Sequence, residues 1–596
     1  MVEKNQIIRA VTEALSSNGE GIVRHEGITF FVPYCLPGEK ISFRVLKIKD
    51  KIGYGKAEEI FTPAEERVRP KCPVFTRCGG CQLQHLSYRC QLRFKGNVVK
   101  DALRKIAGID IPVPAAVKSD LPYGYRNKLQ LPVGVDKEGK NVIGFYAERS
   151  HRIVPLSGCP IHPDWAGSLI AALGRYMEEC AVKGYDEETK KGSIRHIVVR
   201  EIAGKFIVVL VSATEELPNL AHFESLLGEI FPVFTLWLNV NDKDTNVIFG
   251  EKFILKSGPG FFEGEECGIR YEAGPSTFVQ VNAGVRAKLY EAVVRGIVPD
   301  GDEVVVDGYS GGGLLTAMLA RACRRAYGIE LEEEAVRCAE SLREKNGIPN
   351  MINLCGRVEE KLSGVLDKEK GEKLRLVLDP PRAGIARSVL KSVLESGIGR
   401  IAIVSCNPAT LARDLGILTG SLIEREGELV KNPAYAEAKA AAESAASAQT
   451  EGAGESRALL SDETESFSGN FGGLKDYYHI GRIQPFDMFP QTRHVETVVL
   501  LSKLNTKQHI EVELNLDELD LTSAESKATY EEIKAYVLEH TGLKVSHLYI
   551  AQVKQKYGII ERENYNKPKS ENAKQPKCPP EKEAAITEAL KFFGMI

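Results

Sequence analysis

The chain has 596 residues, a formal net charge of −3 and 43% hydrophobic residues. This length exceeds what one hydrophobic core supports and predicts three or more domains. The small net charge excludes a uniformly basic nucleic-acid surface but allows local basic patches. No apolar run is long enough to span a bilayer, and residues 1–5 do not begin a secretory signal, so we expect a cytoplasmic protein that contacts no membrane. The 13 cysteines predict metal ligands, a nucleophile and core residues rather than disulfides.

Residues 1–65 are predicted to form a small β-barrel. Three stretches rich in β-forming residues, 28–32, 39–45 and 54–57, are separated by glycines, as in a sheet of short strands joined by turns. Together with the glycine-containing run at 19–23, they resemble a TRAM domain, an OB-like barrel that binds RNA. Four lysines suit contact with phosphates, a solvated hairpin being the alternative: Lys47, Lys49, Lys51 and Lys56.

Three cysteines lie close together in the next region, residues 66–275: Cys72, Cys78 and Cys81, with two glycines between the last two. Glycines let a backbone fold tightly around a metal and expose its amides to sulfur. Cys159, in a Gly/Pro loop, is the predicted fourth ligand, and Cys90 is a rival in a helix-like stretch. Four thiolates suit zinc or an iron–sulfur cluster, and the wide spacing between Cys72 and Cys78 favours the cluster. Three unrelated core thiols are the alternative.

Residues 276–502 repeat the pattern of strand, glycine turn and helix, which predicts a doubly wound parallel sheet. Strands are expected at 303–307, before 330, at 374–379 and at 401–405. Residues 434–473 are rich in Ala, Ser, Gly and Glu with little to bury, so we expect a disordered insertion there. Residues 503–596 form an extension with a predicted helix at 530–540 and no assigned role.

Two of these strands end in residues that carry chemistry. An apolar run leads into Ser405-Cys406-Asn407-Pro408, and another leads into Asp379-Pro380-Pro381. In open α/β sheets, ligands gather at the carboxyl ends of the strands. A lone cysteine is usually a small hydrophobic residue, but a thiol at such an exit is placed to be a nucleophile.

A glycine-rich turn at 308–313 follows the first strand, and Glu330 ends the second. Glycines allow close approach to a ligand, and an acid at the end of the second strand can hold ribose hydroxyls. The turn lacks the regular spacing of a dinucleotide fingerprint. S-adenosylmethionine therefore fits better than a dinucleotide, and Asp379 is placed to take another polar group of the ligand.

Taken together, these motifs resemble those of the RNA uracil-5-methyltransferase family, most of all its iron–sulfur members that modify 23S ribosomal RNA. The resemblance covers residues 6–501 without the insertion, and the tail has no counterpart in it. Further motifs that carry it are Phe278-Val279-Gln280-Val281-Asn282 and the run at 487–496.

The resemblance implies a Rossmann-like methyltransferase domain at 276–502, preceded by a central iron–sulfur α/β domain. It implies that the methyl donor contacts Gln280, Tyr309, Glu330 and Asp379. It also implies a [4Fe-4S] cluster on the four cysteines Cys72, Cys78, Cys81 and Cys159. Cys406 would be the nucleophile and Glu496 the base. The insertion lies between these two residues, so their approach depends on its looping out.

Such a reaction needs a thiolate that adds to carbon 6 of uracil, because carbon 5 alone is a poor nucleophile. The target base must leave its stack, and Arg126 and Lys128 are candidates to hold the RNA, with a surface turn as the alternative. We expect a monomeric enzyme acting on 23S ribosomal RNA. A transfer-RNA enzyme, a non-catalytic RNA-binding iron–sulfur protein, and a hydrolase using Cys406 and His494 are the alternatives; the last leaves Glu330 without purpose.

Overall fold

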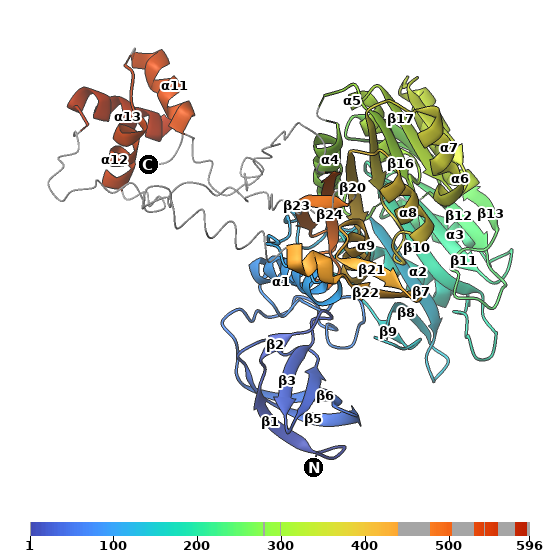
Figure 1. The fold of residues 1–596 in the computed structure, drawn as a ribbon. Helices are drawn as coiled ribbons and strands as arrows, with labels where there is room; N and C mark the ends of the chain where they lie inside the picture. The colour runs from blue at the N-terminus through green and yellow to red at the C-terminus, as the bar shows by residue number, and fades with distance from the viewer. Residues whose placement is uncertain are drawn as a thin grey trace. The chain divides into compact units, whose positions relative to one another are not determined.

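The computed structural model describes residues 2–277, 280–298, 300–438, 477–503, 530–541, 543–557 and 578–592. The chain divides into two compact units, residues 1–509 and 510–596. The first unit holds three larger sheets that follow one another along the chain, and the described residues of the second form three helices (Figure 1). Most of the predicted insertion, from residue 439 on, lies outside the described residues. Among the described helices, none is long and apolar enough to cross a bilayer.

Residues 7–62, where the sequence predicts a small β-barrel, form a six-stranded sheet. Its order is β1 (Ile7–Val11), β5 (Lys40–Lys49), β6 (Ile52–Thr62), β4 (Ile28–Val32), β3 (Gly21–His25) and β2 (Ala14–Leu15). Phe30 and Phe43 are fully buried between its strands. A Cβ atom at Gly53 or Gly55 would overlap these two rings, so glycine in β6 is what lets the aromatic core close.

A seven-stranded sheet forms the central region. Its order is β13 (Lys252–Ser257), β12 (Phe234–Val240), β11 (Lys205–Ser212), β10 (Ile194–Ile202), β7 (Lys128–Val135), β8 (Asn141–Tyr146) and β9 (Ile153–Pro155). Helices α2 (Trp165–Glu179) and α3 (Leu220–Gly228) share a hydrophobic core with Leu129 and Leu131 of β7. Side chains alternate along a strand, so Lys128 and Gln130 lie on the opposite face, which lines a cavity.

The third sheet is the doubly wound sheet that the sequence predicts. Its order is β18 (Met351–Cys355), β17 (Arg325–Glu330), β16 (Val304–Gly308), β19 (Leu374–Leu378), β20 (Arg400–Ser405), β24 (Glu496–Lys503) and β23 (Tyr478–Phe486). The first five strands are parallel, and β24 and β23 run antiparallel. The middles of β16, β19 and β20 are apolar runs, as in a parallel sheet that helices cover on both faces.

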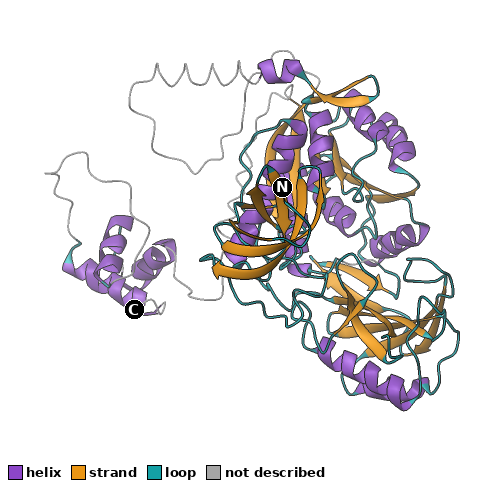
Figure 2. Cartoon of the chain, turned by 90° about the horizontal axis from the view of Figure 1, so that it is seen from below, coloured by secondary structure: helices purple, strands orange, loops and turns teal. Residues whose placement is uncertain are grey.

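Helices pack on both faces of this sheet (Figure 2). Helices α4 (Ala283–Ile297), α5 (Leu314–Ala322) and α6 (Glu333–Lys345) pack with Val305, Val377 and Val404. Helices α7 (Val358–Lys368), α8 (Arg387–Glu395) and α9 (Pro408–Leu418) pack with the alternate residues Val306 and Leu378. The short hairpins β14 (Phe262–Glu266) with β15 (Ile269–Ala273), and β21 (Leu422–Arg425) with β22 (Glu428–Lys431), complete this part.

The second unit contains α11 (Tyr530–Thr541), α12 (His547–Lys556) and α13 (Pro580–Phe592). They share a small core of Ile533, Val537, Ile550 and Ile586. The predicted helix at 530–540 is therefore present.

Candidate active site

The carboxyl edge of the third sheet gathers the acidic and thiol groups that the sequence singles out. The strand order reverses between β16 and β19, and ligands of open α/β sheets bind at that switch point. Asp379 and Cys406 directly follow β19 and β20. Because β24 is antiparallel and pairs Thr497 with Ser405, Glu496 begins its strand beside the residue that ends the neighbouring one. The structure thus brings Cys406 and Glu496 together despite the insertion between them.

Cys406 lies between β20 and α9, just before the helix cap. The Asn407 side chain accepts a hydrogen bond of 3.1 Å from the Ala409 amide, and Pro408 is the first helical residue. Burial and the nearby Glu496 carboxyl raise the pKa of the Cys406 thiol, whereas the Arg382 guanidinium lowers it. The amino terminus of α9 also favours a thiolate at this place. The thiol is thus placed for nucleophilic attack and depends on local cations for its ionised form.

Glu496 is almost fully buried. Burial and the neighbouring Asp379 raise its pKa to about 8, while Arg382 and Lys95 act in the opposite direction. A carboxylate whose pKa lies near neutrality can accept a proton far more readily than an ordinary glutamate. The sequence alone did not point to Arg382 or Lys95. Arg382 directly follows Asp379-Pro380-Pro381, but nothing local marks Lys95.

The glycine-rich turn after β16 forms the part of this edge where the sequence predicts the methyl donor. The Glu330 carboxylate accepts hydrogen bonds from the amides of Gly311 at 2.8 Å and Leu331 at 2.7 Å, which ties the end of β17 to the turn. Tyr309 has a φ of 67°, a left-handed conformation that non-glycine residues rarely adopt and that clusters at functional sites. Burial raises the pKa of its phenol to about 12.

Two acids at this edge have oxygens suited to hold a ligand. Asp307 accepts a hydrogen bond of 2.6 Å from Thr316 through one carboxylate oxygen, while the other is buried without a partner. Burial raises the pKa of both Asp307 and Asp379 to about 7. Buried polar atoms are normally paired, so the free Asp307 oxygen fits a hydrogen-bond donor such as an ammonium or hydroxyl of S-adenosylmethionine. The sequence motif contained Asp307, but only its burial marks it as functional.

Gln280 lines a separate cavity of about 590 Å³ next to the central sheet, together with Arg126, Lys128, His162 and His196. Its main-chain oxygen accepts hydrogen bonds of 3.3 Å from Asn127 and Arg286. The neighbouring motif residues 278 and 279 lie outside the described part of the chain.

The four predicted metal ligands converge. Burial is the main cause that raises the pKa of Cys72, Cys78, Cys81 and Cys159. In addition, each of the six pairs among these thiols interacts electrostatically. Cys90 instead packs with Leu83 and Phe94 in another hydrophobic cluster, so the structure does not support it as the fourth ligand. We call the four convergent cysteines the thiol site.

The spacing of the thiol site bears on the metal it fits. Sulfurs around a tetrahedral zinc ion lie about 3.8 Å apart, given the usual Zn–S bond length. Among the described residues, the one group of three ligand atoms within 4.8 Å of one another is Asp300, Asp302 and Glu303, which contains no cysteine. Among the described residues, no three of the four sulfurs therefore lie within 4.8 Å of one another.

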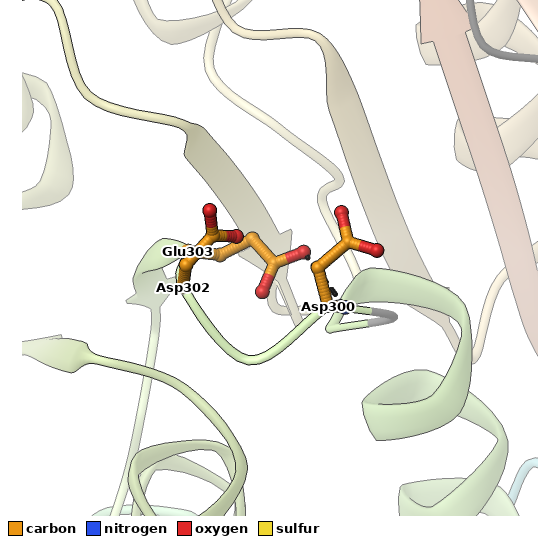
Figure 3. A group of neighbouring side chains, drawn as sticks. All are labelled: Asp300, Asp302 and Glu303. Atoms are coloured by element: carbon orange, nitrogen blue, oxygen red, sulfur yellow. Dashed lines mark hydrogen bonds between the residues drawn. The ribbon is translucent and has the colours of Figure 1, made fainter.

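The acidic group itself belongs to the turn before β16 (Figure 3). Lys373 forms ion pairs with Asp302 at 2.8 Å and Asp300 at 3.4 Å. Glu303 accepts a hydrogen bond of 2.8 Å from the Gly301 amide. Each of the three carboxylates already has a partner, so the acidic group has a structural explanation without a metal.

The loop that leads to Glu496, residues 487–495, is held by the segment that carries the thiol site. The amides of Gln82 and Leu83 both donate to the Gln491 carbonyl, at 3.1 and 3.0 Å. Gln491 has a φ of 69° and is almost fully buried. The Tyr125 hydroxyl donates to the Pro490 carbonyl at 3.2 Å.

Helix α1 (Tyr88–Ala102) holds the same loop from another side. The Lys95 ammonium forms a fully buried ion pair with Asp487 and donates to the Phe489 carbonyl at 3.0 Å. Unpaired buried charges are expensive, so this pair strongly favours the observed position of the loop.

Comparisons with known proteins agree with this geometry. Residues 261–425 match the family described as tRNA (Uracil-5-)-methyltransferase. A protein named as an uncharacterized RNA methyltransferase from Clostridium tetani is 34% identical over 514 residues, covering 85% of this chain and 98% of that protein. One from Halalkalibacterium halodurans is 33% identical over 511 residues, covering 85% and 98%.

A solved structure is similar over the same region. The crystal structure of Pyrococcus abyssi tRNA (uracil-54, C5)-methyltransferase in complex with S-adenosyl-L-homocysteine has a TM-score of 0.59 and 25% identity, covering 83% of this chain and 99% of that one. The fold and the carboxyl-edge site are those of an S-adenosylmethionine-dependent RNA methyltransferase. More particularly, the chain belongs to the RNA uracil-5-methyltransferase family, as its motifs predict.

Proposed function

We propose that this enzyme methylates carbon 5 of a uridine in 23S ribosomal RNA through a covalent adduct with Cys406, as a monomer in the cytoplasm. The observation that carries the proposal is the meeting of Cys406 with Glu496 at the adjoining ends of β20 and β24. A thiol and a carboxyl of raised pKa, side by side at the ligand-binding edge of the sheet, suit nucleophilic addition followed by proton removal.

The protein groups would act in sequence. The Cys406 thiolate bonds to carbon 6 of the flipped uracil, and the electron pair of the 5,6 double bond moves onto carbon 5 and the 4-oxygen. S-adenosylmethionine supplies the methyl group that carbon 5 acquires. Glu496 then takes the proton from carbon 5, the double bond re-forms, and the bond between carbon 6 and sulfur breaks. Arg382 favours both the thiolate and the ionised carboxylate, because its charge lowers both pKa values.

The donor would lie along the turn after β16. Glu330 and the left-handed Tyr309 shape that turn, and Asp307 and Asp379 offer oxygens to it. Gln280 is proposed to contact the donor from the family motif alone, since its side chain lines the neighbouring cavity.

The thiol site is proposed to hold a [4Fe-4S] cluster on Cys72, Cys78, Cys81 and Cys159. Their convergence supports this assignment, as does the finding that no three of these described sulfurs lie within 4.8 Å of one another. The Gly80 amide donates to the Cys78 sulfur at 3.4 Å, as amides around clusters do.

The RNA is proposed to run over the cavity beside the central sheet and over a TRAM-like sheet at residues 7–62. Burial lowers the pKa of Lys128 to about 8, and the charges of Arg200 and Arg126 contribute to the same shift. One nitrogen of His162 and one of His196 are buried without partners. Crowded cations and unsatisfied polar atoms on one cavity suit a phosphodiester and the edge of a base.

Transfer RNA is the second candidate substrate, because the matching family and the Pyrococcus abyssi structure are both named for it. The thiol site favours ribosomal RNA by its resemblance to the iron–sulfur members.

The deciding experiment incubates the protein and its Cys406→Ala variant with methyl-labelled donor and 23S ribosomal or transfer-RNA transcripts, and identifies the labelled nucleoside. We expect 5-methyluridine in the ribosomal transcript, lost by more than about 10⁴-fold in the variant. Exposed Cys355 supplies the matched control Cys355→Ala, which keeps full activity. Label in transfer RNA alone would reassign the substrate, and turnover by Cys406→Ala would exclude the covalent route.

A further inference from the structure

Hydrogen bonds join the segment that carries the thiol site to the 487–495 loop. The loop is bonded to the residues that immediately follow Cys81, namely Gln82 and Leu83. The Gln82 side chain also accepts a hydrogen bond of 3.4 Å from the Arg493 amide and donates one of 2.8 Å to Gly79. A single short segment therefore contacts both the thiols and the loop.

The side chain of Phe489 provides a second connection. It belongs to the same hydrophobic cluster as Cys72, Cys81 and Cys159, and its ring lies 6.1 Å from that of His494. Phe489 is thus a member both of the cluster that contains three of the thiols and of the loop that ends at Glu496.

Gln491 is the residue through which residues 82 and 83 hold the loop, and we call its contacts with them the latch. Its backbone is left-handed, which a non-glycine residue adopts only where its surroundings impose it. Those surroundings are the backbone amides of residues 82 and 83, the side chain of Gln91, and the Pro122 carbonyl, which accepts from the side-chain nitrogen of Gln491 at 3.3 Å. Without the first two contacts, the Gln491 carbonyl would lose both of the amides that hold it, and only the bonds to Gln91 and Pro122 would still favour the left-handed backbone and the path toward Glu496.

We propose that the thiol site positions Glu496: a filled thiol site holds residues 78–83, these hold Gln491, and Gln491 fixes the loop that delivers the carboxylate to the side of Cys406. The inference rests on the function proposed above, with Gln491 as a positioning residue. It predicts that losing the metal or the latch slows proton removal from carbon 5, while donor binding and thiol addition continue.

The first test follows hydrogen exchange in the full-length protein, purified anaerobically, before and after removal of its metal by a chelator. We expect the amides of residues 78–83 and 487–496 to exchange at least about 10-fold faster after removal, while those of 304–313 and the affinity for S-adenosyl-L-homocysteine stay unchanged. Unchanged exchange at 487–496 would overturn the proposal, and so would acceleration everywhere, which would show that the metal merely supports folding. This test needs no methyl transfer, so it remains decisive if the proposed function fails.

The second test uses Gln491→Ala, which leaves all four thiols and the main-chain bonds to residues 82 and 83 in place but removes the side-chain bonds to Gln91 and Pro122 that hold Gln491 in its left-handed conformation. Its substrates are the RNA transcript that the unaltered protein methylates and the same transcript with 5-fluorouridine at the target. Fluorine cannot leave as a proton, so the fluorinated RNA reports adduct formation and methyl transfer without the base step. We expect normal trapping of the fluorinated RNA but turnover on uridine slowed by about 10²-fold.

A matched variant separates positioning from general destabilisation. Asn239→Ala removes another buried amide, one that bonds Gly250 and Lys252 in the central sheet. We expect it to lower thermal stability without changing the ratio of trapping to turnover. Equal loss of trapping and turnover in Gln491→Ala would show a merely structural role and overturn the proposal.

Discussion

Gln91 and Gln491, which are 400 residues apart in the sequence, exchange two hydrogen bonds in the interior of the protein. The Gln491 amide donates to the Gln91 side-chain oxygen at 3.1 Å, and the Gln91 side-chain nitrogen donates back to the Gln491 side-chain oxygen at 3.0 Å. The same nitrogen donates to the carbonyls of Leu83 and Leu86. One amide thus joins helix α1, the end of the thiol segment and the loop before Glu496.

Gln91→Leu should therefore destabilise the fold. The substitution preserves bulk but removes the Gln91 partner of the Gln491 amide, of the Gln491 side-chain oxygen and of the Leu86 carbonyl, which costs about 3 kcal/mol in total. Denaturant unfolding measures the difference. Exposed Gln6 accepts one hydrogen bond from Glu3, so Gln6→Leu is the control and should change stability by less than about 0.5 kcal/mol. Equal stability of Gln91→Leu and the unaltered protein would show that these hydrogen bonds contribute nothing to the free energy of unfolding.

The sequence predicted those residues of the site whose positions follow from local pattern. Asp379 and Cys406 stand at the ends of apolar runs, and parallel strands place such ends on one edge, so their neighbourhood followed without a structure. Glu330 followed in the same way. Glu496 came from the family motif, because nothing local shows that an antiparallel strand would return it to the end of β20.

The contacts around the 487–495 loop were beyond local pattern. Lys95 stands on α1, and only the fold shows that it is fully buried against Asp487. Gln491 is one polar residue among many, and its left-handed backbone depends on amides supplied from residues 82 and 83. Such pairings across about 400 positions are set by tertiary structure, which neither periodicity nor spacing records.

The thiol site predicts the colour of the protein. Purified without oxygen, it should be brown with a broad absorbance band in the visible blue and about four iron atoms per chain. Cys81→Ser should lose the band, whereas Cys90→Ser, with a sulfur in a different cluster of side chains, should keep it. A colourless protein with one zinc ion per chain would instead show that the thiols close around a smaller centre.

Glu496→Gln should trap the reaction after methyl transfer. The amide preserves the shape of the buried side chain but cannot accept the carbon-5 proton, so the Cys406–RNA bond should persist and migrate as a slow band on a denaturing gel. Turnover should fall by about 10²–10⁴-fold. Exposed Glu395 provides the control Glu395→Gln, which should leave no band. Normal turnover by Glu496→Gln would assign the base to another group.

Turnover should rise with pH through the titration of Glu496. The carboxyl must be ionised to take the proton, and burial raises its pKa to about 8, so the rate should be low at pH 6 and rise through about pH 8. The raised pKa of the Cys406 thiol extends the rise to higher pH. The charged groups that act on it are Asp379, which raises its pKa, and Arg382 and Lys95, which lower it. Lys95→Met removes one of the two cations and should move the rising limb to higher pH.

Arg382→Gln should move that limb in the same direction, and Asp379→Asn in the opposite one. Single-turnover rates across the pH range, measured with saturating donor, separate this effect from weaker binding. A limb that stays in place in Lys95→Met would mean that Lys95 acts on the loop only through Asp487 and Phe489.

Lys128→Gln should weaken RNA binding without affecting chemistry at saturation. Lys128 lies on the cavity wall among Arg126, Arg200 and the unpartnered ring nitrogens of His162 and His196, and the crowding of cations there favours a phosphate between them. Anisotropy of a fluorescent transcript at several salt concentrations should show a salt slope reduced by about one, the signature of one lost phosphate contact.

Exposed Lys140 pairs with Glu138 at the β7–β8 turn, so Lys140→Gln is the matched control and should retain the slope. A loss of maximal rate in Lys128→Gln, with binding and slope unchanged, would place Lys128 in the reaction itself. Loss of affinity with an unchanged slope would show that Lys128 contacts a base, because only displaced counterions make affinity depend on salt in this way.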